Sequence, residues 1–143
     1  MKKLLGVLCA GMLLAGCSGG GEPVTKTCTS SLGGKMNMEW VLEGTSDTLE
    51  KATMKISIAY DAIGIDKDSS EEEKEKFDKE TKQSMIDELE DGDVTGLDVT
   101  SGFDDNGWNM SISAEASMLE KAVNSTSMDE AVKEVEGQGF TCK

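Results

Sequence analysis

The chain has 143 residues and a formal net charge of −14, which comes from 28 acidic residues against 14 lysines. This negative field repels phosphate backbones and anionic lipid surfaces, so we expect no nucleic-acid partner. The chain contains no histidine and no arginine, and therefore no side chain with an ordinary pKa near neutrality and no guanidinium to hold a phosphate. This composition argues against an enzyme, and we expect no cofactor.

Residues 1–16 have the pattern of a secretory signal peptide. Lys2 and Lys3 precede an apolar run of 11 residues that extends from Leu4 to Leu14. A bilayer-spanning helix needs about 20 apolar residues, so this run suits the core of a removable leader. Cleavage of the leader would remove both lysines and leave the mature chain more acidic still.

The leader ends in Leu14-Ala15-Gly16-Cys17, which resembles the bacterial lipobox. In that motif the cysteine sulfur receives a diacylglyceryl group, which requires the thiolate form, and the leader is cut just before the cysteine. Two acyl chains anchor a protein stably where one is marginal. We therefore predict that Cys17 is lipidated, that residues 17–24 include a glycine-rich linker, and that one domain at residues 25–143 is held at the outer face of the cell membrane. The alternative is an ordinary signal peptide followed by an unmodified cysteine.

Two cysteines remain for the domain itself. Cys9 leaves with the leader and Cys17 takes the lipid, which leaves Cys28 and Cys142 near the two ends of the domain. Outside the cytoplasm such a pair favours a disulfide, because both cysteines lie in segments that look extended and could run side by side. Two buried free thiols are the alternative. Two cysteines without a histidine make a weak metal site, so we expect no metal there.

Two segments near the start of the domain alternate between apolar and polar residues, which is the pattern of half-buried strands. The apolar positions of the first segment are Met36, Met38, Trp40 and Leu42. Those of the second segment are Ala52, Met54, Ile56, Ile58 and Tyr60. A polar turn at residues 44–47 separates the segments, so we predict a β-hairpin.

A charged helix is predicted from residue 71 to about residue 90. Ser70 and Glu73 have the spacing of a capping box, and the acidic residues that follow Ser70 suit the positive end of the helix dipole. The apolar stripe of this helix is narrow. It consists of Phe77, Met85, Ile86 and Leu89.

A second hairpin follows the helix. Its first strand presents Leu97, Val99, Ser101 and Phe103 on one side. Its second strand presents Trp108, Met110, Ile112, Ala114 and Ala116. The turn Asp104-Asp105-Asn106-Gly107 joins them, because an Asn-Gly pair accepts the backbone of a tight turn.

The last part of the domain is predicted to be mainly helical. Residues 117–123 suggest a short helical turn, and Ser127 with Glu130 repeats the capping-box spacing before a helix that ends near Gly137. Residues 140–142 suggest a final edge strand. The order strands, helix, strands, helix, with its clean alternation, predicts an α+β fold in which two main helices cover one face of an antiparallel β-sheet.

Several segments of the domain resemble the YehR-like small bacterial lipoproteins, a family of unknown function. The likeness lies in Tyr60-Asp61-Ala62-Ile63-Gly64-Ile65-Asp66 before the charged helix, in the paired strands after it, and in the ending Glu136-Gly137-Gln138-Gly139-Phe140. The resemblance implies an α+β sheet-and-helix domain on a lipid tether. It implies no reaction and no catalytic residues.

Calcium binding and glycoside hydrolysis by paired carboxylates are two candidate activities. Residues 91–96 match the opening of an EF-hand loop, but Gly102 stands where the loop needs a bidentate glutamate. Residues 66–70 fit that loop less well, and helix-to-strand turns explain both segments better. With 28 acidic residues, carboxylate pairs at the spacing of a glycosidase arise by chance.

The large amphipathic side chains are Trp40, Tyr60 and Trp108, which we expect to pack in the core, with a ligand groove or partner surface as the alternative. The leading functional hypothesis is a non-catalytic, membrane-anchored extracytoplasmic domain, monomeric, that binds a partner or serves the envelope. A lipoprotein that binds a small ligand or calcium is the second hypothesis, and a carboxylate-based hydrolase is the third.

Overall fold

The fold was analysed in a computed structural model, which describes residues 21–89, 97–115, 118 and 127–143. The strands are β1 (Val24–Leu32), β2 (Met36–Gly44), β3 (Leu49–Ala59), β4 (Asp98–Phe103), β5 (Gly107–Glu115) and β6 (Thr141–Cys142). The helices are α1 (Tyr60–Ile63), α2 (Glu71–Leu89) and α4 (Met128–Gly137). The element order confirms the predicted α+β class.

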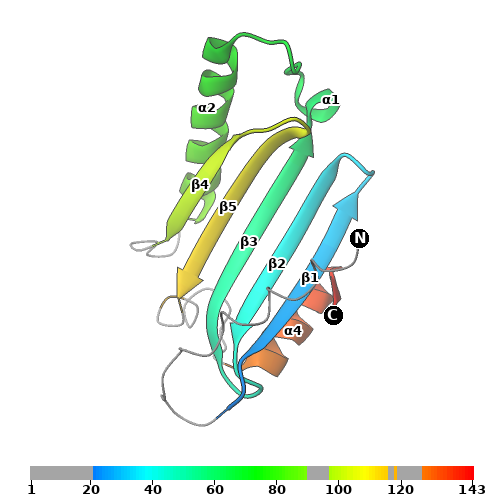
Figure 1. Ribbon diagram of the computed structural model, residues 1–143, viewed down its shortest axis with the longest axis vertical. Helices are drawn as coiled ribbons and strands as arrows, with labels where there is room; N and C mark the ends of the chain where they lie inside the picture. Colours follow the sequence, from blue (N-terminus) through cyan, green and yellow to red (C-terminus); the bar gives the residue numbers. More distant parts are fainter. Residues whose placement is uncertain (1–20, 90–96, 116–117, 119–126) are drawn as a thin grey trace, which may run out of the picture.

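The six strands form one antiparallel sheet in the order β4-β5-β3-β2-β1-β6 (Figure 1). Both predicted hairpins are confirmed. In the first, β2 pairs with β3, with Trp40 opposite Met54. In the second, β4 pairs with β5, with Phe103 opposite Trp108. The central pair, β3 with β5, joins the two hairpins into a continuous sheet.

Both main helices cover the same face of the sheet, as predicted. Successive side chains of a strand point to opposite faces, so Ala52, Met54, Ile56 and Ile58 of β3 share one face. Ala52 belongs to the core cluster under α4, whereas Ile56 and Ile58 belong to the cluster under α2. The strands β1 and β2 pass in front of α4 in Figure 1, which views the sheet from its other side.

The cluster under α4 forms the lower part of the core. The helix contributes Met128, Ala131 and Val135, all buried, and these pack against Leu42 and Leu49 of the sheet. The spacing of three and four residues places the three helical side chains on one face, which explains why a ten-residue helix docks here. Ser127 occupies the N-cap position predicted for it.

The cluster under α2 is built around Trp108, which is completely buried. Phe77 of α2 meets the Trp108 ring edge-on, with ring centroids 6.0 Å apart, and lies 5.9 Å from the ring of Phe103. The Trp108 indole N–H donates to the Asp78 carboxylate at 2.7 Å. A helix with a narrow apolar stripe is thus held by one aromatic cluster and one buried polar contact.

Two local features differ from the predictions. Strand β3 ends at Ala59, and Tyr60 begins the short helix α1. This helix ends before Gly64, which adopts the left-handed conformation typical of a helix end. The first strand, β1, spans nine residues, although only its segment around Cys28 was expected to be extended.

The turns rely on glycine at two points. Gly33 and Gly34 both have positive φ, 61° and 71°, in the turn between β1 and β2. Gly107 lies at the start of β5, where a Cβ atom would collide with the carbonyl oxygen of Ile58. The glycine of the predicted Asn-Gly turn is therefore required for the close approach of β5 to β3.

Candidate functional site

Three residues were predicted to be modified or cross-linked. Cys17 lies outside the described residues. Cys28 and Cys142 form a disulfide, so the predicted pair is present. The two cysteines face each other in antiparallel register between β1 and β6, and Cys28 is completely buried. The disulfide therefore fastens the last strand to the first across a sequence separation of 114 residues.

Main-chain contacts and packing complete this junction. The Thr27 N–H donates to the Lys143 carbonyl at 3.2 Å, and the Lys143 N–H donates to the Thr27 carbonyl at 2.9 Å. Phe140 and Cys142 pack against the buried cluster under α4. The disulfide is thus part of the core, and its position indicates a structural role.

The three large amphipathic side chains pack largely as expected. Trp108 is buried, and Trp40 is half-buried against the cluster under α4. Tyr60 stacks on Phe103 with ring centroids 5.8 Å apart, and its hydroxyl donates to the main-chain carbonyl of Asp104 at 2.7 Å. Tyr60 reaches this position from α1 and not from the predicted strand.

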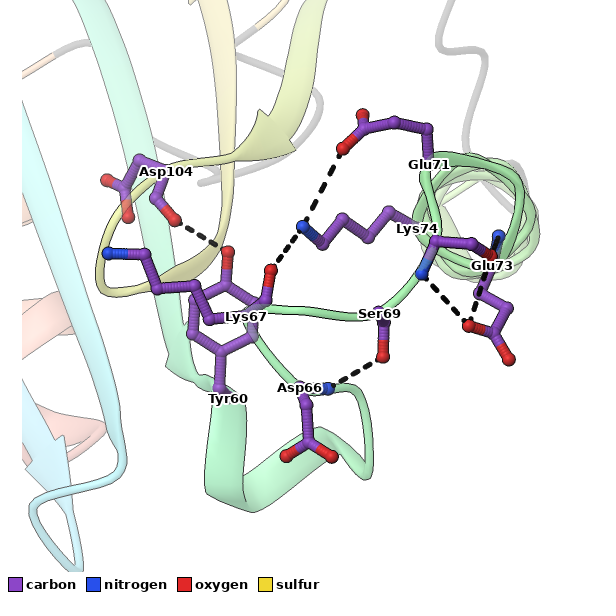
Figure 2. Close-up of polar contacts among 9 residues, drawn as sticks. Tyr60, Asp66, Lys67, Ser69, Glu71, Glu73, Lys74 and Asp104 are labelled. Carbon is purple, nitrogen blue, oxygen red and sulfur yellow. Dashed lines mark hydrogen bonds and ion pairs between the residues drawn. The ribbon is translucent and has the colours of Figure 1, made fainter.

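Residues 66–70, the poorer of the two candidate calcium loops, form a hydrogen-bonded turn that directly precedes α2 (Figure 2). The Asp66 N–H donates to the Ser69 hydroxyl at 3.1 Å, and the Ser69 N–H donates to the Asp66 carbonyl at 3.0 Å. The Asp66 carboxylate points away from the other labelled side chains in Figure 2. No group of three or more metal-ligating side chains is found within the described residues. Residues 91–96 lie outside them.

The capping box at the start of α2 is confirmed. The Glu73 N–H donates to the Ser70 hydroxyl at 3.3 Å, and the Ser70 N–H donates to the Glu73 carboxylate at 3.1 Å (Figure 2). These reciprocal bonds satisfy two donors at the start of the helix. The glutamate is thus committed to helix initiation.

Two lysines connect the loop before α2 to its surroundings. Lys74 is only 14% exposed, and its ammonium donates to the Lys67 carbonyl at 2.6 Å and pairs with Glu71 at 3.7 Å (Figure 2). Lys67 pairs with Asp105 at 2.9 Å, and the hydrogen bond that the ammonium donates to Asp105, together with the negative charge of Asp105, raises the pKa of Lys67. These contacts tie the loop to the turn between β4 and β5.

That turn contains the other perturbed group. The Asp104 carboxylate accepts the N–H groups of Asn106 at 2.7 Å and Gly107 at 3.1 Å. The bond from Asn106 is the largest cause of a lowered pKa at Asp104, and the Asn109 side chain adds to it. Both perturbed groups are thus explained by contacts that fix turns.

The sheet has a second face, which neither α2 nor α4 covers. We call this surface the open face and define it by the outward-pointing residues of the strands. These are Thr25, Thr27, Thr29, Ser31, Asn37, Glu39, Val41, Glu43, Lys51, Thr53, Lys55, Ser57, Asp98, Thr100, Gly102, Asn109, Ser111, Ser113 and Glu115. Most are serine, threonine or asparagine, and Val41 is the only large apolar side chain among them.

The centre of the open face is nearly neutral. Its charged residues, Lys55 and Glu39, pair with each other at 3.1 Å across β2 and β3. Beside them, the hydroxyls of Thr53 and Ser113 bond to each other at 3.0 Å. On a chain with a net charge of −14, this part of the surface offers hydrogen-bonding groups with little net field.

Two shallow depressions lie at this neutral centre, both on the open face. One lies over β3, β4 and β5, and the other lies over β1, β2 and β3. The first, about 350 Å³, is lined by residues that include Thr100, Gly102, Asp104 and Asn109. The second, about 430 Å³, is lined by side chains that include Thr29 and Asn37. Lys55 and Ser57 of β3 line both, so the depressions adjoin along one strand.

From the sequence, these residues are predicted only to be the polar, outward positions of the alternating strand segments. A signal was nevertheless present, because the outward positions of β3 and β5 include Thr53, Ser57, Asn109, Ser111 and Ser113. Helix α2 of this chain is by contrast densely charged. The neutral outward residues on adjacent strands therefore distinguish the open face from the charged surface of α2.

Comparisons with known proteins place the fold. No protein-family model matches the chain, and no curated protein matches it. The NMR structure of YehR from E. coli is similar, with a TM-score of 0.58 and 13% identity over 86% of this chain and 92% of that chain. An NMR structure of a protein from Streptococcus pneumoniae TIGR4 has a TM-score of 0.46 and 15% identity over 100% of this chain and 98% of that chain.

The likeness to YehR shows the fold alone, since the identity is low. It confirms the YehR-like fold implied by the sequence resemblance. Within the described residues, none of the helices is long and apolar enough to traverse a bilayer.

Proposed function

We propose that this chain is a YehR-like lipoprotein, anchored outside the cytoplasmic membrane through Cys17, whose domain binds a partner without catalysing a reaction. The observation that carries the binding role is the open face. One face of the six-stranded sheet is left uncovered by α2 and α4, and most of its side chains are neutral hydrogen-bonding groups. Solvation alone would be served by the charged side chains that this chain uses elsewhere.

The sequence of the leader supports the anchor. A basic start, an apolar run, the lipobox-like Leu14-Ala15-Gly16-Cys17 and a glycine-rich linker occur in the order that a lipoprotein requires. The disulfide between Cys28 and Cys142 agrees with this address, because disulfides persist outside the reducing cytoplasm.

The described residues favour binding over catalysis. Active sites gather titratable groups whose pKa values are shifted by burial and by one another. Here the shifts at Lys67 and Asp104 arise from turn contacts, and both groups are exposed. The charged residues that line the depressions of the open face are the ion pair of Lys55 with Glu39 and, at the edge of the first depression, Asp104, whose carboxylate is held by the turn.

The tether would also set the orientation of the domain. Val24 is seven residue steps along the chain from Cys17, so the start of β1 lies within about 25 Å of a lipidated Cys17. The end of the sheet with Val24 and the turn between β2 and β3 would then face the bilayer. The opposite end, with Gly33 and α1, would point outward, and the open face would be presented sideways (Figure 1).

The anchor is tested with Cys17→Ser and with the matched control Cys9→Ser, which lies in the leader. The expected result is that wild type and Cys9→Ser partition into the detergent phase and carry a diacylglyceryl mass on the mature N-terminus. Cys17→Ser should remain in the aqueous phase. An unacylated Cys17 by mass spectrometry, or a cytosolic wild-type protein, would overturn the proposed address.

A further inference from the structure

We infer that the open face binds a neutral glycan strand, a polymer whose hydroxyl and amide groups match its side chains. This inference deepens the proposed function by naming the class of ligand for the same surface. Three observations carry it: the low net charge of the surface, its side-chain composition, and the pair of adjoining depressions.

The charge of the molecule selects against ionic ligands. A net charge of −14 repels polyanions, which excludes nucleic acids and acidic polysaccharides from the whole surface. A cationic partner would be drawn to the exposed acidic residues of α2 and α4 and not to the neutral centre of the open face. The central ion pair between Lys55 and Glu39 is internally compensated at 3.1 Å. A neutral ligand remains.

The composition selects against a protein partner. The centres of protein interfaces are enriched in aromatic residues, methionine and arginine and depleted of serine. The open face contains none of the enriched types, and the methionines of β2, β3 and β5 belong to the cluster under α2. Serine and threonine hydroxyls and asparagine amides instead match ligands that both donate and accept hydrogen bonds.

The polar groups of the open face are available for a ligand. Among the described residues, six open-face side chains that line the two depressions make no side-chain hydrogen bond within the protein. They are Thr29, Ser31, Asn37, Ser57, Thr100 and Ser111. Each hydroxyl can donate once and accept twice, so a ligand with alternating hydroxyl and amide groups finds partners along the surface.

The arrangement of the depressions favours a polymer over a single sugar. The two lie on opposite sides of β3 and share Lys55 and Ser57, so a chain that crosses the strands would occupy both. Their volumes, about 350 and 430 Å³, fall at the small end of ligand sites. No aromatic ring on the open face offers a stacking platform. Binding therefore depends on many hydrogen bonds and must grow with ligand length.

The test uses the full mature chain in detergent micelles, with the N-acetylglucosamine hexamer chitohexaose as the probe. Amide chemical shifts are followed by NMR during titration. We expect saturable shifts confined to β1 through β5 residues of the open face, and binding at least about tenfold tighter for the hexamer than for the dimer. An oligogalacturonate of equal length, which is anionic, should bind at least about tenfold more weakly than the hexamer.

Two glycine substitutions provide a matched pair. Gly102 lies in the first depression and Gly137 at the end of α4, and a Cβ atom at either position meets no other atom within 4 Å. Gly102→Gln should fill the depression and weaken hexamer binding about tenfold, whereas Gly137→Gln should change it less than about twofold. Thr29→Val tests the second depression, because it removes a hydroxyl at nearly constant volume. Thermal midpoints establish that each variant is folded.

Absence of shifts at millimolar hexamer, or shifts confined to the helices, would overturn the inference. Equal binding of the hexamer and the anionic oligomer, or equal affinity of Gly102→Gln and Gly137→Gln, would also overturn it. Binding of a protein partner at the open face, with no response to the hexamer, would support the proposed binding role and reject the glycan. Because Cys17→Ser keeps the open face, its titration separates failure of the anchor from failure of the ligand assignment.

Discussion

At the scale of single residues, the contact between Trp108 and Asp78 illustrates how one polar atom positions a helix. The indole ring lies in the core, and its only hydrogen-bond donor reaches a carboxylate on α2 at 2.7 Å. A buried donor that loses its partner costs more free energy than the bond itself contributes. The apolar stripe of α2 is narrow, so this contact matters for docking the helix.

Asp78→Ala should therefore destabilise the domain. We expect a loss of about 1–3 kcal/mol in the free energy of unfolding, measured by urea denaturation followed by Trp fluorescence. Glu75→Ala on the exposed side of the same helix is the control and should change the free energy by less than about 0.5 kcal/mol. Equal effects of the two variants would show that the indole bond contributes little.

The turn residue Asp104 makes a pH-dependent contribution. Its pKa is lowered in the folded state, chiefly by the Asn106 N–H, so the folded state favours the charged carboxylate. The resulting stability is present above the unfolded pKa of about 3.9 and is lost as pH falls through the folded value. Asp104→Asn should thus lower the thermal midpoint at pH 6, with a smaller difference from wild type near pH 2. A pH-independent difference would contradict this assignment.

At the scale of elements, α2 shows what a helix start requires. Ser70 and Glu73 exchange hydrogen bonds, and three glutamates occupy the first turn. The helix has few apolar anchors, so its N-terminus depends on these polar contacts more than that of α4 does. Both helix starts followed from sequence because capping signals are local.

Ser70→Ala should cost about 1 kcal/mol of unfolding free energy, because the Glu73 N–H loses its acceptor. The control is Ser84→Ala, an exposed position inside the same helix, where alanine is the better helix former and a slight gain is expected. Circular dichroism during thermal unfolding measures both. A loss at Ser84 as large as that at Ser70 would argue against the capping role.

The strands divide into those that the sequence predicts and one that it does not. Regular alternation marked β2, β3 and β5, because each buries one side against a helix. Strand β1 carries Thr25, Lys26, Thr27 and Thr29 around one buried cysteine, so it lacks a periodic apolar signal. Its extended form is fixed by nine paired positions with β2. This pairing exists only in the folded protein and leaves no periodic pattern in the sequence of β1. Tyr60 was misplaced for a related reason, since its alternation with Ile58 continued past the end of the ladder.

At the scale of the whole molecule, the disulfide closes nearly the entire domain. Cys28 and Cys142 enclose 114 residues of sequence separation, so the cross-link restricts the unfolded chain strongly. A loop of this length corresponds to about 4–5 kcal/mol in the chain-entropy model. The double variant Cys28→Ser/Cys142→Ser should lose stability of that order in urea denaturation.

Reduction with dithiothreitol supplies the control for this prediction. Wild type should lose a similar amount of unfolding free energy when reduced, whereas the double variant should not respond. If the reduced and oxidised wild-type proteins unfold at the same urea concentration, the cross-link contributes nothing to stability.

The candidate site was less accessible to sequence reasoning than the fold. The cysteine pair followed from an expected extracytoplasmic location and from the extended character of both segments. The amphipathic rings were predicted to be buried because they stand at the apolar positions of their alternating segments. The open face was not found, because its residues are separated by up to 90 positions and meet only when strands β1 to β5 assemble. The alternation of apolar and polar residues shows which side of each strand is polar. Only the order of the strands in the sheet shows that these polar sides form one surface.

The covalent joint between the first and last strands also decides how the domain carries mechanical load. Tension between the linker before Val24 and the chain's far end at Lys143 would run through Cys28 and Cys142 and bypass the chain between them. The enclosed strands and helices would then experience no pull along the polypeptide. A domain built in this way can be stretched from these two points without being unravelled.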